Sequence, residues 1–285
     1  MEYRQYPRGR MLQGADYIEI INEDVQRGNI RFALFDFDGT ISLIRQGWQD
    51  VMVPMMVDTL AQLDTGETRE ELHDIVHEFV TRLTGKQTIY QMMEFAEHVS
   101  KRGGDAKEPI DYKWDYLNRL WERIKDRVEG LKQGRYTRQE MSVAGSLQML
   151  AALHERGVTM YLASGTDRPY VLDESGSLGL HPYFGGNIYG ALDDYEDYSK
   201  AMVIQQIIQE NDLQGSELVG FGDGYVEIEE TKKVGGIAIG MAVDEDRREG
   251  IDEWKRNRLI EYGADVILPD FREYDRLLSY LLSAD

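Results

Sequence analysis

The amino-acid sequence predicts an α/β fold in which an all-helical insert interrupts a parallel sheet just after its first strand. An apolar run of strand type ends in two carboxylates, Asp36 and Asp38, and a strand buried on both faces has this continuous apolar character. Residues 158–285 alternate short apolar runs with helical stretches, which is typical of a parallel sheet. Residues 43–156 show helical periodicity with no strand between, so we expect the insert there.

Composition narrows the class of function. The chain has 285 residues, 42% hydrophobic and 29% charged, as in globular proteins of one or two domains. Its net charge of −20 argues against nucleic acid or an anionic membrane as a partner, since clustered Lys and Arg bind both. The absence of cysteine excludes disulfides and thiolate sites. Because no apolar signal segment opens the sequence, we expect a cytoplasmic location. We also expect a monomer or homodimer that acts on a small molecule.

The expected elements follow in chain order. Residues 1–14 carry Arg, Gly and Pro and are expected to form a loose arm. Residues 15–27 have the apolar spacing of a short amphipathic helix that Gly28 closes, and the first buried strand follows at about 31–36. Four helices are expected in the next region, and the first and last begin with a capping box: about 68–85, 87–102, 111–131 and 137–157. Later strands are expected at about 158–163, 187–192, 218–221, 236–243 and 266–268, and helices at about 169–178, 199–209 and 271–282.

Polar residues stand at the ends of several predicted strands or at the start of the helix that follows. Asp36 and Asp38 follow the first strand, and Asp223 follows the strand at 218–221. Ser164 follows the strand at 158–163, and Lys200 lies in the first turn of a later helix. Because the carboxyl ends of parallel strands share one edge of a sheet, these groups can converge.

The chemistry of this set points to phosphoryl transfer. Asp36 and Asp223, with a backbone carbonyl, supply the hard oxygen ligands that suit Mg²⁺. Asp36 can attack phosphorus to give an aspartyl phosphate, while Asp38 is placed to protonate the leaving oxygen and then to activate water. Lys200 and the turn at Ser164, with its free backbone N–H groups, would stabilise the transferring phosphoryl group.

These residues resemble the motifs of the haloacid dehalogenase-like superfamily, in its phosphatase branch. The matching positions are Asp-x-Asp-x-Thr at 36–40, then Ser164, Lys200 and Gly222-Asp223. The resemblance implies a Rossmann-like core of residues 31–45 and 136–285, which follows an N-terminal arm and helix of residues 1–30. It also implies a helical cap of residues 46–135.

The same resemblance assigns roles to the site residues. It implies that the phosphate is bound by Thr40, Ser164, Gly165 and Lys200, and that Mg²⁺ is bound by Asp36, Asp223 and the carbonyl of Asp38. Glu227 stands where the family usually has Asp, so its longer side chain is expected in the outer shell of the metal. Substrate choice is expected to lie with residues near the cleft between cap and core: Arg45, Trp48, Lys86 and Gln87.

Several functions remain open at this point. The main hypothesis is a Mg²⁺-dependent phosphatase that acts on a small phosphorylated metabolite such as a sugar phosphate. A phosphomutase could use the same groups, and a non-catalytic sugar-phosphate-binding regulatory protein could use the same scaffold. His73 and His77 have a zinc-protease spacing but no evident third ligand, so we expect them to flank a core face instead. The acidic residues within 193–197 lack an EF-hand spacing, so we expect a solvated loop there.

Overall fold

A central sheet organises the structure, a computed structural model that describes residues 4–192, 198–212 and 214–283. Within the described residues, eight strands form one sheet in the order β1-β2-β8-β7-β6-β3-β4-β5. The strands from β3 to β8 are parallel, and β1 and β2 extend one edge antiparallel. The bounds are β1 (Arg10–Met11), β2 (Glu19–Ile20), β3 (Phe32–Phe35), β4 (Thr159–Asp167), β5 (Ile188–Ala191), β6 (Leu218–Gly222), β7 (Ile237–Met241) and β8 (Val266–Leu268).

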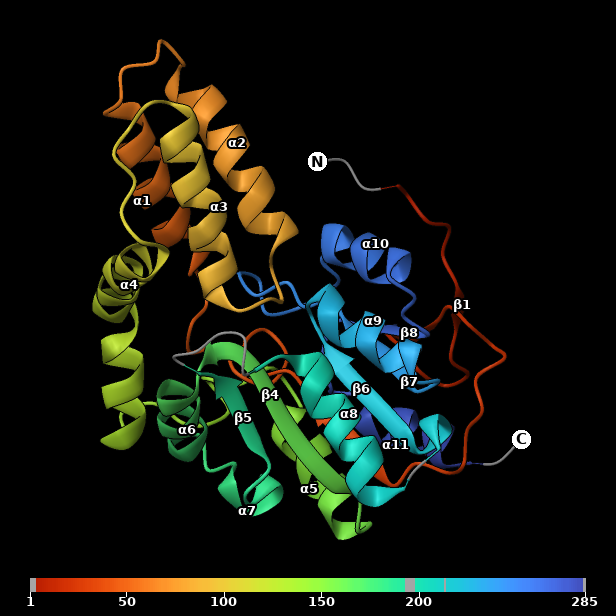
Figure 1. The fold of residues 1–285 in the computed structure, drawn as a ribbon. Helices are drawn as coiled ribbons and strands as arrows, with labels where there is room; N and C mark the ends of the chain where they lie inside the picture. Colours follow the sequence, from red (N-terminus) through yellow and green to blue (C-terminus); the bar gives the residue numbers. More distant parts are fainter. Residues whose placement is uncertain (1–3, 193–197, 213, 284–285) are drawn as a thin grey trace.

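Helices cover both faces of the sheet (Figure 1). In β3, Phe32 and Leu34 pack in a cluster with Ile204 of α8, whereas Phe35 lies in the main core and stacks on Phe221 of β6 with ring centroids 4.5 Å apart. This alternation buries β3 on both sides, as its apolar sequence predicts. The helices of this part are α5 (Ser146–Glu155), α6 (Arg168–Ser177), α7 (His181–Phe184), α8 (Lys200–Asn211), α9 (Tyr225–Lys233), α10 (Glu253–Glu261) and α11 (Tyr274–Leu282), with a 3₁₀ turn at Gly215–Glu217.

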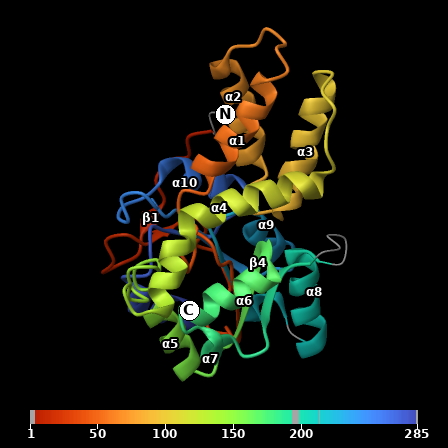
Figure 2. The same cartoon turned by 90° about the vertical axis from the view of Figure 1, so that its left-hand side faces the viewer.

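A helical cap stands beyond one end of the sheet (Figures 1 and 2). It is inserted between β3 and α5, as predicted, and consists of α1 (Gln49–Ala61), α2 (Arg69–Arg82), α3 (Thr88–Lys101) and α4 (Pro109–Lys132). The predicted capping box opens α2, because Thr68 accepts a hydrogen bond from the Glu71 N–H and the Glu71 carboxylate accepts one from the Thr68 N–H. The α/β fold with an all-helical insert is therefore confirmed, while the exact limits of the cap stay a prediction.

The expected N-terminal helix is wrong. Residues 15–27 contain β2 instead, which pairs antiparallel with β8. Ile18, Glu19 and Ile20 are all buried, and the Glu19 carboxylate binds the Arg256 guanidinium at 2.6 Å. The described part of residues 1–14 is not a loose arm either, because β1 pairs with β2 and Arg256 donates hydrogen bonds to the carbonyls of Tyr6 and Pro7.

The second predicted helix start is also wrong. Thr137 and Glu140 do make the reciprocal hydrogen bonds of a capping box, but they close a turn, and α5 begins only at Ser146. Gly145 separates the two with φ 77°, and a Cβ there would overlap the backbone of Phe271. The chain must therefore turn closely past Phe271 before it can enter the helix.

The later elements that were predicted lie within a few residues of their expected positions, although β4 extends to Asp167 and the final helix starts at Tyr274. The helices α1, α7, α9 and α10 had no predicted counterpart. The acidic segment 193–197 lies outside the described residues. Across the described ranges, every helix is too short or too polar to cross a membrane.

Candidate active site

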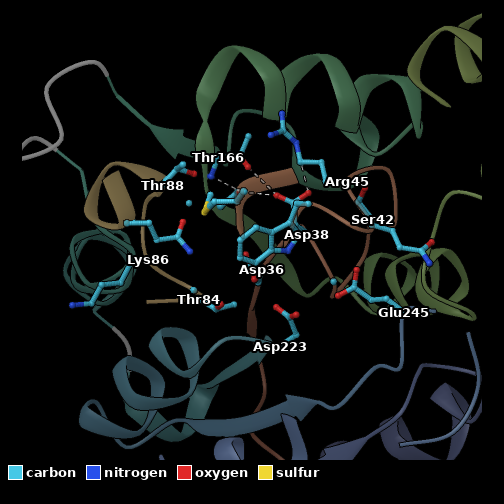
Figure 3. A pocket seen from close by; sticks show the side chains of 18 of the residues that line it. Asp36, Asp38, Ser42, Arg45, Thr84, Lys86, Thr88, Thr166, Asp223 and Glu245 are labelled. Atoms are coloured by element: carbon cyan, nitrogen blue, oxygen red, sulfur yellow. Dashed lines mark hydrogen bonds and ion pairs between the residues drawn. The ribbon is translucent and has the colours of Figure 1, made fainter. Parts of the chain in front are cut away.

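The predicted strand ends meet in one pocket of about 90 Å³ between the sheet edge and the cap (Figure 3). Core residues that line it include Asp36, Asp38, Ser164, Gly165, Lys200 and Asp223. Cap residues include Trp48, Thr84, Lys86 and Tyr116, and Arg45 lines the pocket from the segment that leads into the cap. Among the predicted site residues, Thr40, Gln87 and Glu227 lie outside this lining.

Asp36 follows β3 and is 5% exposed. Its backbone N–H donates to the carbonyl of Phe221, so it continues the pairing of β3 with β6. The Lys200 ammonium lies 2.9 Å from its carboxylate. Burial raises the pKa of Asp36 to about 6, against the attraction of Lys200, and repulsion from Asp223 adds to the rise. The Lys200 ammonium beside it favours the ionised form of Asp36.

Asp38 is held by hydroxyl donors from β4 and by Arg45. Thr166 Oγ1 donates to Asp38 Oδ2 at 3.0 Å, and Ser164 Oγ lies 3.3 Å from the same oxygen. Arg45 Nε lies 4.0 Å from Oδ1. Burial raises the pKa of Asp38 to about 7, opposed by Arg45 and supported by Glu174. A carboxyl with this pKa can give and take a proton near neutral pH.

Arg45 is buried in an ion pair with Glu174 of α6. Its Nη2 and Nε atoms donate to the Glu174 carboxylate at 2.7 and 3.1 Å. The guanidinium also lies over the Tyr170 ring, 5.5 Å from its centroid. Figure 3 shows the Arg45 side chain extending over Asp38. The predicted contact between Arg45 and a substrate stays a prediction, but the structure places the residue where it acts on Asp38.

Lys200 joins Asp36 to Glu227. It is the first residue of α8, after the N-cap Ser199, whose hydroxyl accepts the Met202 N–H at 3.1 Å. The Lys200 side chain is 4% exposed, and its ammonium contacts the carboxylates of both Asp36 and Glu227. Glu227 is fully buried, so the structure shows it as a partner of the lysine. Its predicted role in the outer shell of a metal stays a prediction.

Asp223 is fixed by the loop that carries the first acids. Its backbone N–H donates to Thr40 Oγ1 at 3.1 Å, so the Thr40 hydroxyl faces the protein rather than the pocket. Gly39 has φ 73°, and a Cβ there would overlap the Asp223 carboxylate. The glycine therefore lets the two strand-end loops approach closely enough for Asp223 to face Asp36.

The residues present fit a magnesium ion. Asp223 lies close enough to Asp36 to raise its pKa by repulsion, which a divalent cation would relieve. No hydrogen bond within the described ranges ends on the Asp38 carbonyl oxygen, so it is free to bind a cation. The described residues hold no cluster of three or more His, Asp or Glu side chains arranged for a metal. Two carboxylates and a carbonyl suit Mg²⁺, which keeps several waters when bound.

The cap reaches the core through the loop between α2 and α3. A Cβ on Gly165 would lie 2.6 Å from the Lys86 carbonyl oxygen, so the loop rests directly on the end of β4. The Gln87 side chain donates to the Tyr198 carbonyl at 2.7 Å, which holds the loop to the core from outside the pocket. The Lys86 ammonium points away from the carboxylates (Figure 3) and lies over the Tyr90 ring.

Some site residues were not predicted from the sequence. Thr166 follows Ser164 in the polar end of β4, where the sequence predicts a turn, and could have been found there. Glu245 lines the pocket, and the rule that polar residues at strand ends converge could have found it after β7. Glu174 and Lys255 lie inside helices, and no local pattern distinguishes them.

The comparison with known families agrees with this geometry. Residues 30–235 match the family model of haloacid dehalogenase-like hydrolases. The chain belongs to this family. The matched segment of the haloacid dehalogenase-like hydrolase runs from β3 through the cap to the end of α9, and it contains Asp36, Asp38, Lys200 and Asp223.

A comparison with curated proteins found no match. Solved structures share the fold of this haloacid dehalogenase-like hydrolase at low sequence identity. A haloacid dehalogenase-like protein of unknown function from Agrobacterium tumefaciens is 15% identical, with a TM-score of 0.57 over 89% of this chain and 100% of that one. A predicted phosphoglycolate phosphatase from Haemophilus somnus is 12% identical, with a TM-score of 0.56 over 87% and 98%. β-Phosphoglucomutase from Clostridium difficile is 13% identical, with a TM-score of 0.56 over 89% and 100%.

Proposed function

We propose that this protein is a Mg²⁺-dependent phosphatase that hydrolyses a small phosphorylated metabolite, such as a sugar phosphate, through an aspartyl-phosphate intermediate. The observation that carries the proposal is the pair of acids after β3. Asp36 contacts the Lys200 ammonium at 2.9 Å, which favours its ionised form, whereas Asp38 accepts a hydrogen bond from Thr166 and burial raises its pKa to about 7. One carboxylate is thus suited to attack and the other to proton transfer.

The residues divide the reaction between them. Asp36 attacks phosphorus, and the phosphorus–oxygen bond to the leaving group breaks while protonated Asp38 gives that oxygen its proton. Asp38, now ionised, takes a proton from the water that attacks the aspartyl phosphate, which releases phosphate and restores Asp36. Lys200 and the backbone N–H of Gly165 stabilise the negative charge of the phosphoryl group, whereas the Thr166 N–H already donates to Ser164 Oγ at 3.0 Å. Mg²⁺ held by Asp36, Asp223 and the Asp38 carbonyl would supply further charge stabilisation.

The pocket supports a small substrate. Its volume of about 90 Å³ accommodates a phosphoryl group and a short leaving group beneath the cap. Arg45, Trp48 and Lys86 border this space, and Gln87 holds the loop that carries Lys86, so we propose that these residues select the leaving group. We also propose residues 31–45 and 136–285 as the core and 46–135 as the cap. A cytoplasmic location and a monomer or homodimer remain predictions.

The first test is the release of phosphate from p-nitrophenyl phosphate. We expect turnover by the wild-type protein with Mg²⁺, loss of turnover on chelation, and a loss of at least about 100-fold in Asp36→Asn. An Asp275→Asn variant, changed on the exposed first turn of α11, serves as the control for a carboxylate outside the site. Equal turnover by the wild type and Asp36→Asn would refute the proposal and favour the non-catalytic, regulatory alternative.

A screen of phosphorylated metabolites then separates phosphatase from phosphomutase. Each substrate is incubated with the protein and Mg²⁺, and both free phosphate and positional isomers of the substrate are measured. Release of phosphate in step with the loss of substrate supports the phosphatase. Isomerisation without phosphate release would show that the cap returns the phosphoryl group to its substrate.

A further inference from the structure

A fifth strand end contributes to the pocket. The loop after β7 carries Glu245 to the pocket lining, close to Gly39 and Asp223. Lys255, on the first turn of α10, lies behind that lining and binds both acids. Its ammonium lies 2.9 Å from Asp223 Oδ2 and 2.8 Å from Glu245 Oε1. Neither Glu245 nor Lys255 belongs to the motifs that carry the proposed phosphatase reaction.

We propose that Lys255, oriented by Glu245, is a positioning residue that holds the Asp223 carboxylate in the orientation in which it binds a divalent cation. The proposal rests on the proposed function only in taking Asp223 as a cation ligand. Lys255 is not a catalytic residue, because the described residues that line the pocket include Glu245 but not Lys255.

The Asp223 carboxylate is restrained from two directions. Its backbone is fixed by the hydrogen bond to Thr40, and Lys255 binds its Oδ2 atom. Within the described ranges no hydrogen bond reaches Oδ1, which leaves that oxygen for a cation. Partners of this kind fix the orientation of metal ligands, and their loss typically weakens metal binding by about 10–100-fold.

Charge balance explains why a lysine can stand beside a cation ligand. A lone ammonium at 2.9 Å from Asp223 would repel a divalent cation. Glu245 supplies one negative charge to the same ammonium, so the pair of Glu245 and Lys255 adds no net charge to the site. Asp223 therefore keeps its attraction for the cation while its orientation is fixed. If Lys255 acted only by its charge, its removal would strengthen cation binding instead.

The test measures Mg²⁺ binding to the full chain by isothermal titration calorimetry at one pH. We expect Lys255→Met to bind Mg²⁺ about 10–100-fold more weakly than the wild type, and Lys255→Arg to recover part of the affinity. The matched control is Lys232→Met, which breaks a similar pair, with Asp265 at 2.8 Å, elsewhere in the core. We expect its Mg²⁺ affinity to equal that of the wild type.

Binding of Mg²⁺ by folded Lys255→Met as tightly as by the wild type, or more tightly, would overturn the proposal. If circular dichroism shows that Lys255→Met is unfolded, Glu245→Gln decides. That variant leaves the lysine charge uncompensated beside Asp223, so we expect weaker binding, and unchanged binding would overturn the proposal. Failure of the wild type to bind Mg²⁺ would instead refute the proposed function, which separates the two results.

Discussion

The buried pair of Arg45 and Glu174 offers a sharp test of how the cap is joined to the catalytic acids. Arg45 is the last residue of the proposed core segment 31–45, just before the cap, and Glu174 lies on α6 of the core. Their side chains are only 9% and 4% exposed. Arg45→Met would leave the Glu174 carboxylate buried without its partner, whereas the double variant Arg45→Met/Glu174→Met would remove both charges.

The size of the effect follows from burial and from the hydrogen bonds between the two side chains. Breaking a buried ion pair on one side costs about 3–5 kcal/mol, because an uncompensated charge remains. Replacing both partners with apolar residues of similar size is neutral or stabilising by about 1–4 kcal/mol. We therefore expect Arg45→Met to lower the free energy of unfolding by about 3–5 kcal/mol, and the double variant to recover most of that loss.

The assay is urea unfolding followed by circular dichroism, for the wild type, both single variants and the double variant. Arg69→Met is the control, because its ion pair with Asp58 is exposed and such pairs contribute about 0–1 kcal/mol. A loss below about 1 kcal/mol in Arg45→Met, or a double variant as unstable as the single one, would refute the account of this pair.

The same variants also report on Asp38. Arg45 lies 4.0 Å from Asp38 and opposes the rise in its pKa, while Glu174 supports that rise. Arg45→Met should therefore raise the pKa of Asp38 further, and the double variant should return it toward the wild-type value. The pH dependence of phosphate release from an alkyl phosphate measures this shift, because an alkoxide leaving group requires a proton from Asp38.

Two further predictions concern proton binding and the contact between cap and core. Because burial raises the pKa of Asp38 from 3.8 to about 7, the folded metal-free protein binds a proton that the unfolded chain releases. The resulting stabilisation is complete below pH 3.8 and is lost as the pH rises through about 7. Urea unfolding should therefore show that the wild type loses stability relative to Asp38→Asn across this range. A difference in unfolding free energy that stays constant with pH would contradict this prediction. Gly165→Ala places a Cβ 2.6 Å from the Lys86 carbonyl oxygen and should raise KM several-fold. The control Gly186→Ala meets no atom within 4 Å and should leave KM unchanged. Equal KM values for the two variants would show that the loop between α2 and α3 does not rest on Gly165.

The main features of the site could be predicted because its chemistry is written in short segments. Asp36, Asp38 and Asp223 follow the ends of apolar strands, Ser164 follows the apolar part of β4, and parallel pairing brings these positions to one edge. Local patterns therefore sufficed to place them. The same rule would have placed Glu245 after β7.

Long-range pairing accounts for what the sequence did not reveal. Glu174 and Lys255 act through partners 129 and 32 residues away, and their own helices show no unusual pattern. The wrong helix at 15–27 has a related cause. Ile18, Ile21 and Val25 fit a helical period, whereas Ile18 and Ile20 fit a strand, and only the pairing of β2 with β8 and the burial of Glu19 against Arg256 select the strand.

The central claim is that Asp36 forms a covalent bond to phosphorus, and chemical trapping tests it most directly. The full chain is mixed with Mg²⁺ and a phosphoryl donor, quenched in acid, reduced with borohydride and digested, and the peptides are sequenced by mass spectrometry. The account predicts that the reduced carboxyl, as homoserine, replaces Asp36 only when donor and Mg²⁺ are both present. Steady turnover with an unmodified Asp36, or reduction at another carboxylate, would contradict it.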